Sequence, residues 1–162
     1  MSAATLDYKI NAPMTSDQFI DVLRRSTLAA RRPVDDRAAI EAMVKHGNLC
    51  VTAWEGDKLV GVARSLTDFH YACYMSDLAV DVEWQHRGVG VELIAVTQRQ
   101  LNAGCKIRLL AAPAAVGYYP KIGFVHNPNC WELERSRLPG TADAQDGKPE
   151  PLTNENGQHS QD

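Results

Sequence analysis

One short segment limits what this chain can fold into more than any other part of it. Residues 85–90, Gln-His-Arg-Gly-Val-Gly, stand between a strand-like run at 71–82 and a helical pattern at 89–102. A glycine-rich turn between a strand and a helix lets the backbone approach an anion, and the first N–H groups of the helix have no internal partner. The spacing fits a phosphate-binding turn and a purely structural tight turn equally well, and Arg87 adds a cation that suits the former.

Two common nucleotide-binding loops do not match this segment. A P-loop needs Lys and then Ser or Thr after its last glycine, but Val91 and Glu92 follow Gly90. The dinucleotide-binding fingerprint needs a third glycine three residues farther on, where this chain has Leu93. The segment is therefore not predicted to bind a nucleotide in either of these ways.

The rest of the chain alternates strand-like and helix-like patterns in an order that predicts an α/β (α+β) fold. Thr15 and Gln18 form a capping box for the first helix, Asp35 is predicted to cap the second helix, and Gly47 to end it. Hairpins followed by a strand–helix–strand unit predict a mixed sheet with helices on its faces. Strands are predicted at 6–10, 49–54, 59–65, 71–82, 106–112, 123–127 and 130–134, and helices at 16–28, between Asp35 and Gly47, at 89–102 and at 114–122.

Size and composition fit one globular domain with a polar tail. The chain has 162 residues, of which 44% are apolar, and residues 139–162 hold five acidic residues and one lysine with very few apolar ones. Such a segment cannot offset its ordering entropy by burial, so we expect a folded domain at 1–138 and a disordered tail at 139–162. The body is then nearly neutral, which argues against nucleic acid as a main partner.

Neither a membrane span nor a metal site is expected. The chain has no run of 18 apolar residues, and its first residues lack the basic and apolar regions of a signal peptide, so we expect a cytoplasmic protein. The four cysteines, at positions 50, 73, 105 and 130, are too far apart in the sequence to form a close metal-binding or redox pair.

Two motifs, taken together, resemble a known pair of signatures. Residues 78–80, Leu-Ala-Val, followed by the 85–90 turn, have the form of an apolar strand end and then Gln/Arg-x-x-Gly-x-Gly/Ala. Residues 118–124, Tyr-Tyr-Pro-Lys-Ile-Gly-Phe, have the form aromatic-Tyr-x-Lys-x-Gly-Phe. In this order and at this separation, the two resemble the acetyl-CoA-binding motifs of the GCN5-related N-acetyltransferase (GNAT) superfamily, and the predicted elements resemble its fold over residues 6–135.

The resemblance implies a mostly antiparallel sheet in which the strand ending at residue 80 splays from the strand at 106–112. The pantetheine arm of acetyl-CoA, the implied co-substrate, would lie between these strands, and its pyrophosphate on the backbone of the turn. One departure is residues 111–115, Ala-Ala-Pro-Ala-Ala, where many members of the family carry a cofactor-contacting asparagine. The implied cofactor-binding residues are Leu78, Ala79, Val80, Gln85, His86, Arg87, Gly88, Val89 and Gly90.

The resemblance also implies a candidate for the chemistry. Tyr119 matches the family's tyrosine that commonly protonates the departing thiolate of CoA, and the alternative is that its ring only packs against the cofactor or the core. Asp77 is a weak candidate for the general base, with a paired structural aspartate as the alternative. His70 and Glu83 are weaker candidates, read first as surface residues.

The implied function is transfer of an acetyl group from acetyl-CoA to a primary amine of a small molecule by direct attack in a ternary complex. The alternatives are a protein lysine or N-terminal acetyltransferase and a non-catalytic acyl-CoA sensor. Arginines 24, 25, 31 and 32 could pair with a carboxylate of the acceptor or with the 3′-phosphate of CoA, or could be solvated surface residues. Many members of the family are dimers, so a homodimer is a further expectation.

Overall fold

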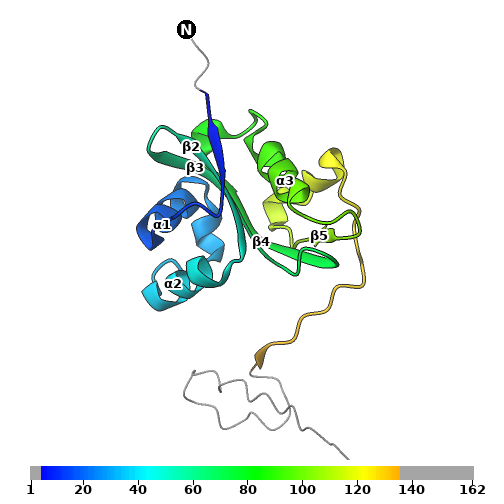
Figure 1. Cartoon of the computed structure of the whole chain (residues 1–162). Helices are drawn as coiled ribbons and strands as arrows, with labels where there is room; N and C mark the ends of the chain where they lie inside the picture. Colours follow the sequence, from blue (N-terminus) through cyan, green and yellow to red (C-terminus); the bar gives the residue numbers. More distant parts are fainter. Residues whose placement is uncertain (1–4, 136–162) are drawn as a thin grey trace, which may run out of the picture. The chain divides into compact units, whose positions relative to one another are not determined.

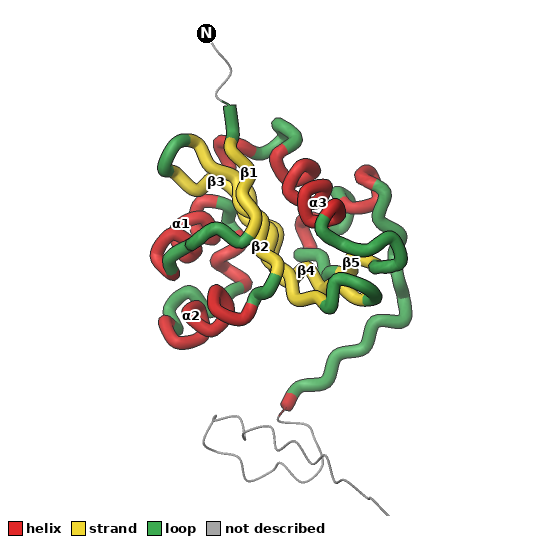
Figure 2. Tube along the Cα trace, in the orientation of Figure 1, coloured by secondary structure: helices red, strands yellow, loops and turns green. Residues whose placement is uncertain are grey.

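The part of the chain that ends at Phe124 folds around a central mixed sheet. The structure, a computed structural model, describes residues 5–135, and the chain divides into two units after Phe124. Neighbouring strands are antiparallel except β4 and β5, which pair in parallel (Figures 1 and 2). The predicted α/β fold with a mixed, mostly antiparallel sheet is confirmed. In their order across the sheet, the strands are β1 (Asp7–Ile10), β2 (Leu49–Glu55), β3 (Lys58–Thr67), β4 (Ala72–Val80) and β5 (Lys106–Arg108).

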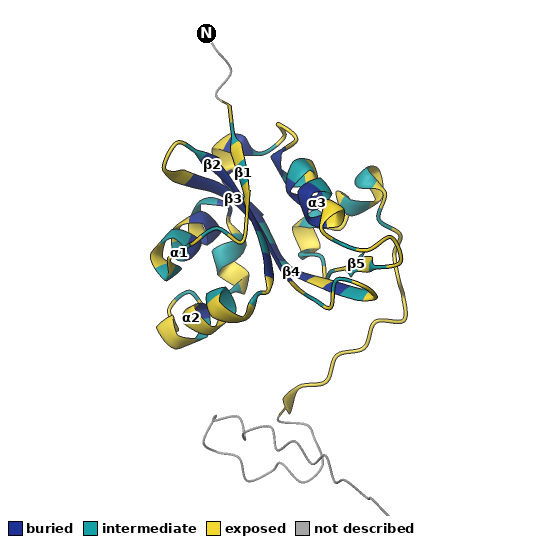
Figure 3. Ribbon diagram, in the orientation of Figure 1, coloured by how far each residue is buried: buried dark blue, intermediate teal, exposed yellow. Residues whose placement is uncertain are grey.

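Helices cover both faces of the sheet. α1 (Ser16–Arg25) and α2 (Arg37–His46) lie on one face, and α3 (Val89–Arg99) lies on the other (Figure 1). Each face has its own apolar core, and the buried residues lie in the sheet and in the helices where they meet it (Figure 3). Phe19 is fully buried on the α1 side and Leu93 on the α3 side, so the apolar stripes that predicted these helices are the faces they bury.

The three helices begin in different ways. Thr15 caps α1 through the predicted capping box with Gln18. Asp36, not the predicted Asp35, caps α2, because its carboxylate accepts from the backbone N–H three residues farther on. The residue before α3 is Gly88, which provides no side-chain cap. The N–H groups in the first turn of α3 therefore lack the partner that the other two helices have.

A β-bulge in β4 decides which core each side chain of this strand faces. The pairing register between β3 and β4 skips Ser76, which is therefore the extra residue. Met75 belongs to the core on the α3 side, but Ala79, four residues later, belongs to the core on the α1 side. Strict alternation along a strand would place both on the same face. The bulge thus turns Asp77 toward α1 and α2.

Two buried carboxylates after the bulge connect β4 to the α1 side of the sheet. Asp77 is 1% exposed and pairs with the guanidinium groups of Arg32 and Arg64. Asp81, also 1% exposed, pairs with Arg25 at the end of α1. A buried carboxylate is tolerated only when it is paired and hydrogen-bonded. These contacts therefore fix the segment that joins α1 to α2 against β4.

Several element boundaries differ from the prediction because 3-10 helices replace the expected regular structure. The first helix ends at Arg25 and is followed by η1 (Leu28–Arg31). The strand predicted at 71–82 ends at Val80, because Asp81 caps η2 (Val82–Trp84) through the Glu83 N–H.

The region after α3 departs further from the prediction. β5 ends at Arg108 rather than at residue 112, and the helix predicted at 114–122 is instead η3 (Pro113–Ala115) and η4 (Tyr119–Ile122). Both short helices carry a proline in their first turn, and a proline inside a longer helix would remove a hydrogen bond and clash with the preceding turn. Gly123 ends η4, with φ of 95°.

The two strands predicted at 123–127 and 130–134 are wrong, because no residue in either range is in a strand. An apolar pattern becomes a strand only where a neighbouring strand accepts and donates its backbone hydrogen bonds. Val125 and Trp131 are 90% and 92% exposed, so the residues that suggested strands are not buried. The predicted tail at 139–162 lies outside the described residues.

Asp77→Ala is expected to lower the free energy of unfolding by about 3–5 kcal/mol, because two guanidinium groups would lose their carboxylate in a buried setting. Urea unfolding followed by circular dichroism measures this loss. Asp17→Ala is the control: Asp17 pairs with Arg37 at the surface, and its removal should leave the unfolding midpoint nearly unchanged. A loss below about 1 kcal/mol for Asp77→Ala would show that the pairs do not hold this region together.

Candidate functional site

A cavity of about 680 Å³ opens beside the second half of β4. One wall is the segment between α1 and α2, from Ser26 to Arg32. The floor is β4 on both sides of the bulge, and the opposite wall is formed by Leu109 and Leu110 after β5, by η3 and by Tyr119. Elements from distant parts of the chain therefore meet around this cavity, and both sequence motifs contribute to its lining.

The strands β4 and β5 separate inside this cavity. They pair only from Ala72 to Tyr74, where β5 ends, while β4 continues to Val80. Beyond Tyr74, the β5 side of β4 has no strand partner among the described residues, and Leu78, Ala79 and Val80 line the cavity there. The predicted splay of this strand pair is confirmed. A free strand edge of this kind suits an extended ligand that carries amide groups.

Gly88 gives the start of α3 a backbone conformation that other residues adopt only with strain. Its φ is +81°, in the left-handed region, and a side chain at this position would meet nothing within 4 Å. Glycine is therefore required here by the backbone and not by crowding. His86, two residues earlier, also has a positive φ, of 60°. The turn leads into three helix N–H groups that have no side-chain cap, an arrangement that attracts anions.

Gly90 has a different reason to be glycine. A Cβ at this position would lie 3.1 Å from the Tyr118 hydroxyl and 3.8 Å from Val80 Cγ2. Tyr118 therefore reaches the first turn of α3, and Val80, which lines the cavity, lies beside the same turn. Val80 therefore lies next to both the cavity and the uncapped helix start.

The other residues of the turn take separate positions. Gln85 lines the cavity and donates from Nε2 to the Val80 carbonyl over 3.0 Å. The Arg87 guanidinium lies 5.1 Å from the centre of the Trp84 ring, a cation–π distance, while His86 is exposed. Val89 is buried in the core on the α3 side, so only its backbone is available to a ligand.

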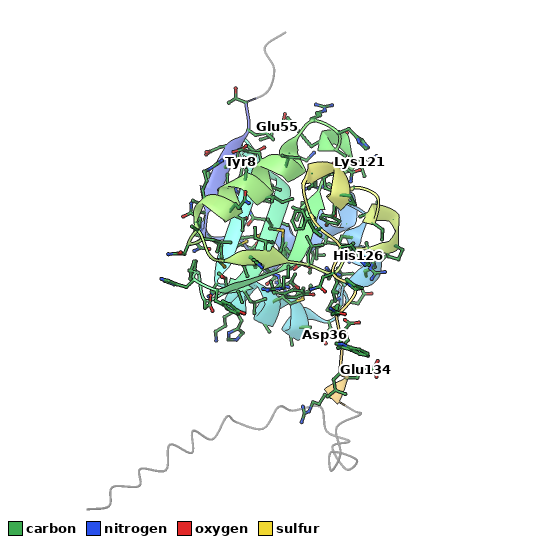
Figure 4. All side chains as sticks on the ribbon, turned by 90° about the vertical axis from the view of Figure 1, so that its right-hand side faces the viewer. Tyr8, Asp36, Glu55, Lys121, His126 and Glu134 are labelled. Carbon is green, nitrogen blue, oxygen red and sulfur yellow. The ribbon has the colours of Figure 1, made fainter. Side chains whose placement is uncertain are left out.

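Tyr119 lines the cavity opposite β4. Its ring contacts the rings of Tyr118 and Phe124 edge to face, with centroids 5.4 and 5.3 Å away. Burial, and secondarily the neighbouring Tyr118, raise the pKa of the Tyr119 phenol above its usual value of 10.0. Lys121, two residues later, points outward and is exposed, as expected for a solvated residue (Figure 4). Tyr119 is thus a protonated phenol facing the cavity.

No Asp, Glu or His of the described chain lines the cavity. Asp77 lies behind the floor, buried between two guanidinium groups, an arrangement that fits the structural alternative better than proton transfer. His70 is exposed and contacts the backbone of Asp68. Glu83 pairs with Lys58 at the surface. The candidate bases from the sequence are therefore not brought together with Tyr119.

Comparison with known proteins identifies the family. Residues 17–132 match the family model described as the acetyltransferase (GNAT) domain. The chain belongs to the GNAT acetyltransferase family. It is 28% identical over 114 residues to GCN5-related N-acetyltransferase 1, chloroplastic, of Arabidopsis thaliana, a match that covers 68% of this chain and 58% of that protein. It is 32% identical over 74 residues to the uncharacterized N-acetyltransferase ycf52 of Pyropia yezoensis, covering 44% and 42% of the two chains. The chain thus spans less than two thirds of these relatives.

Solved structures share the fold of this GNAT domain. A putative acetyltransferase from Deinococcus radiodurans R1 has a TM-score of 0.65 at 20% identity, over 83% of this chain and 92% of its own. The aminoglycoside N-acetyltransferase AAC(6')-Iy, solved in complex with CoA, has a TM-score of 0.62 at 18% identity, over 83% and 97%. At these identities the likeness establishes the fold alone.

Two further findings bear on what the site can hold. Among residues 5–135, no group of three or more His, Cys, Asp or Glu side chains is placed to hold a metal ion. In the same part of the chain, no helix has the length and apolar character needed to cross a membrane.

Sequence reasoning singled out arginines 24, 25, 31 and 32, in and beside the wall formed by residues 26–32, as possible partners of the acceptor or of CoA, but it missed the buried partners of two of them. Asp77 pairs with Arg32 of the wall and Asp81 with Arg25 at the end of α1, and these aspartates follow their arginines by 45 and 56 residues. The position of Tyr118 at Gly90 was also missed, because residues this far apart leave no periodic signal. The pattern Gly-x-Gly was the one signal that a side chain or ligand comes close to this helix start.

Gly88→Val is expected to weaken CoA binding, because a β-branched side chain strains the left-handed turn and occupies the open space in front of the helix N–H groups. Thermal shift measured with and without CoA tests this. Gly56→Val is a matched control, since Gly56 also has a positive φ, of 57°, and open space around it, but lies in the hairpin turn between β2 and β3. Both variants should melt earlier, but only Gly88→Val should lose the CoA-dependent shift. An equal CoA shift in both would make the turn merely structural.

Proposed function

We propose that this protein transfers an acetyl group from acetyl-CoA to a primary amine of a small molecule. The observation that carries the proposal is that a free strand edge and a half-buried phenol line one cavity, with an uncapped helix start beside it. The helix start suits a pyrophosphate, the strand edge suits the amides of pantetheine, and the phenol suits a departing thiolate. Membership in the GNAT family supports acetyl-CoA as the donor.

The residues implied by the sequence would divide the binding of acetyl-CoA between them. Backbone N–H groups of Gly88, Val89 and Gly90 would hold the pyrophosphate, with Arg87 and His86 at its outer side. The edge of β4 at Leu78, Ala79 and Val80 would pair with the pantetheine arm, and Gln85, already bound to the Val80 carbonyl, would shape the junction. Neighbours of the same fold include an aminoglycoside acetyltransferase solved with CoA, which supports CoA as the ligand.

The chemistry follows from the groups that face the cavity. The amine nitrogen attacks the thioester carbonyl carbon, the carbon–sulfur bond breaks, and the thiolate takes the proton of the Tyr119 hydroxyl, which then regains a proton from water. The nitrogen loses its own proton to water, because no carboxylate or imidazole of the described residues lines the cavity. Ser26, Thr27 and Ser76 line the cavity without a base beside them, which favours direct attack in a ternary complex over a covalent acyl-enzyme.

A small acceptor is favoured over a protein. The cavity of about 680 Å³ falls in the usual range of small-ligand sites, and the relatives of known fold include two proteins named as aminoglycoside acetyltransferases. A cytoplasmic location and a homodimer remain predictions from the sequence and the family.

Tyr119→Phe should lower kcat by about 10²-fold or more, because the departing thiolate loses its proton donor. Release of free thiol from acetyl-CoA over a panel of amines measures kcat, and thermal shift with CoA should stay close to wild type. Tyr71→Phe is the control, since Tyr71 is 73% exposed and does not line the cavity. Unchanged turnover in Tyr119→Phe would make this ring a packing residue. Absence of both thiol release and a CoA-dependent shift in the wild type would refute the proposed function.

At low pH, the pKa that governs kcat/KM should be that of the acceptor amine and not that of a group in the protein. Because water is the proton acceptor, the rate should rise with pH up to the pKa of each amine, so two amines of different pKa should give two different limbs. On the alkaline side, Tyr119 must stay protonated, and its raised pKa moves the loss of activity to a pH above 10.0. An acid limb at the same pH for both amines would reveal a base in the protein.

A further inference from the structure

The charged residues that line the cavity are all of one sign. They are Arg31 and Arg32, and no Asp or Glu of the described chain joins them. Both belong to the wall between α1 and α2, beside the point where β4 and β5 separate. A site for a polycation would be expected to present carboxylates. This cavity is lined by two arginines instead.

The positive charge of this wall is not cancelled by the buried aspartate behind it. Asp77 is a single carboxylate shared between the guanidinium groups of Arg32 and Arg64. One positive charge is therefore in excess within this cluster. The cluster is largely shielded from water, with Arg64 only 5% exposed, so solvent screens the excess charge weakly.

Arg31 is the cation that is free to bind a ligand. It is exposed, and its side chain makes no hydrogen bond or ion pair with another described residue. The next residue, Arg32, donates from Nη2 to the Ser76 carbonyl over 2.7 Å as well as to Asp77, so the backbone at Arg31 is held against the bulge. Arg31 is thus an unpaired guanidinium on a fixed segment at the edge of the cavity.

The position of Arg31 favours an acceptor over the nucleotide end of CoA. The Ser76 carbonyl, which anchors this wall, precedes Val80 by four residues of extended strand, about 13 Å. Val80 borders the uncapped start of α3, where a pyrophosphate would bind. The wall at Arg31 and the helix start therefore lie near opposite ends of the exposed edge of β4.

An apolar surface lies on the same side of the strand. Tyr74 lines the cavity and is 42% exposed, and its cross-strand neighbour Leu66 is 43% exposed. Directly opposed residues of antiparallel strands share a face, so these two side chains form one apolar patch. Leu28 adds a further apolar contribution from the wall that carries Arg31.

From this arrangement we propose that the acceptor is an amine that also carries a carboxylate, which Arg31 binds, and an apolar part, which contacts Tyr74. The proposal rests on the proposed acetyltransferase function and deepens it. The positive wall disfavours the ammonium form of the acceptor and favours the neutral amine, which is the nucleophile. The carboxylate of the acceptor offsets the repulsion between this wall and an acceptor that arrives protonated. A polycationic acceptor would be repelled by the same wall.

The test compares matched amines that differ by one carboxylate. Thiol release from acetyl-CoA is measured with the full chain for 4-aminobutyrate against propylamine, 6-aminohexanoate against pentylamine, and phenylalanine against phenethylamine, each pair at equal concentrations of unprotonated amine. The member with the carboxylate should have a kcat/KM higher by about 10-fold or more in at least one pair, because a charge-assisted hydrogen bond to Arg31 is made only there.

Arg31→Gln should bring that ratio down to about one, and Arg24→Gln should leave it unchanged. Arg24 is the matched control because it is an exposed arginine of the same region that pairs with Asp35 and does not line the cavity. Thermal unfolding of both variants checks that they fold. Equal rates within every pair, an unchanged preference in Arg31→Gln, or a higher kcat/KM for kanamycin or for an end-blocked lysine peptide would each overturn the proposal.

A binding experiment separates this proposal from the acetyltransferase proposal itself. Calorimetry of the CoA-saturated protein with N-acetyl-4-aminobutyrate and with N-propylacetamide compares the two acetylated products without any turnover. The inference is supported, even if no amine is acetylated, when N-acetyl-4-aminobutyrate binds, N-propylacetamide does not, and Arg31→Gln loses this binding. Equal binding of the two compounds, or binding of neither, overturns it. If CoA does not stabilise the protein, the acetyltransferase proposal fails, and the same titrations on the free protein still decide whether Arg31 binds the carboxylate.

Discussion

The buried carboxylate of Asp77, held between Arg32 and Arg64, is the interaction on which the rest of the site depends. It joins the segment after α1, the strand β3 and the strand β4, which come from three separate parts of the sequence. A carboxylate in this setting cannot be left unpaired without a large cost in stability. This interaction therefore holds in place the wall of the cavity, including Arg31 and Arg32.

The β-bulge at Ser76 allows Asp77 of β4 to take part in that interaction. Without the extra residue, Asp77 would face the apolar core on the α3 side together with Met75. With it, Asp77 faces the arginines, and the Ser76 carbonyl becomes an acceptor for Arg32. The same position lies just beyond the point where β4 and β5 part, so one irregularity in the strand serves both the ion pairs and the opening of the cavity.

The proposed chemistry uses few groups. Tyr119 supplies a proton, the start of α3 supplies unpaired N–H groups, and the wall at Arg31 supplies positive charge. Because no carboxylate or imidazole of the described residues lines the cavity, the acceptor nitrogen would lose its proton to water. A positive wall helps with this, because it lowers the stability of the protonated amine. Substrate selection and amine activation would then have the same electrostatic origin.

The sequence by itself determined the local features of this protein. The helix signals at Thr15 and Gly47, the hairpin and the motif around Gly88 are recorded within a few neighbouring residues, because caps, turns and periodic burial depend on short-range geometry. The tertiary structure alone decided which distant side chains meet. It placed Tyr118 at Gly90, gave Asp77 two arginine partners, and left residues 123–134 without a strand. These outcomes depend on long-range pairing and on one unpredicted bulge, neither of which leaves a pattern along the chain.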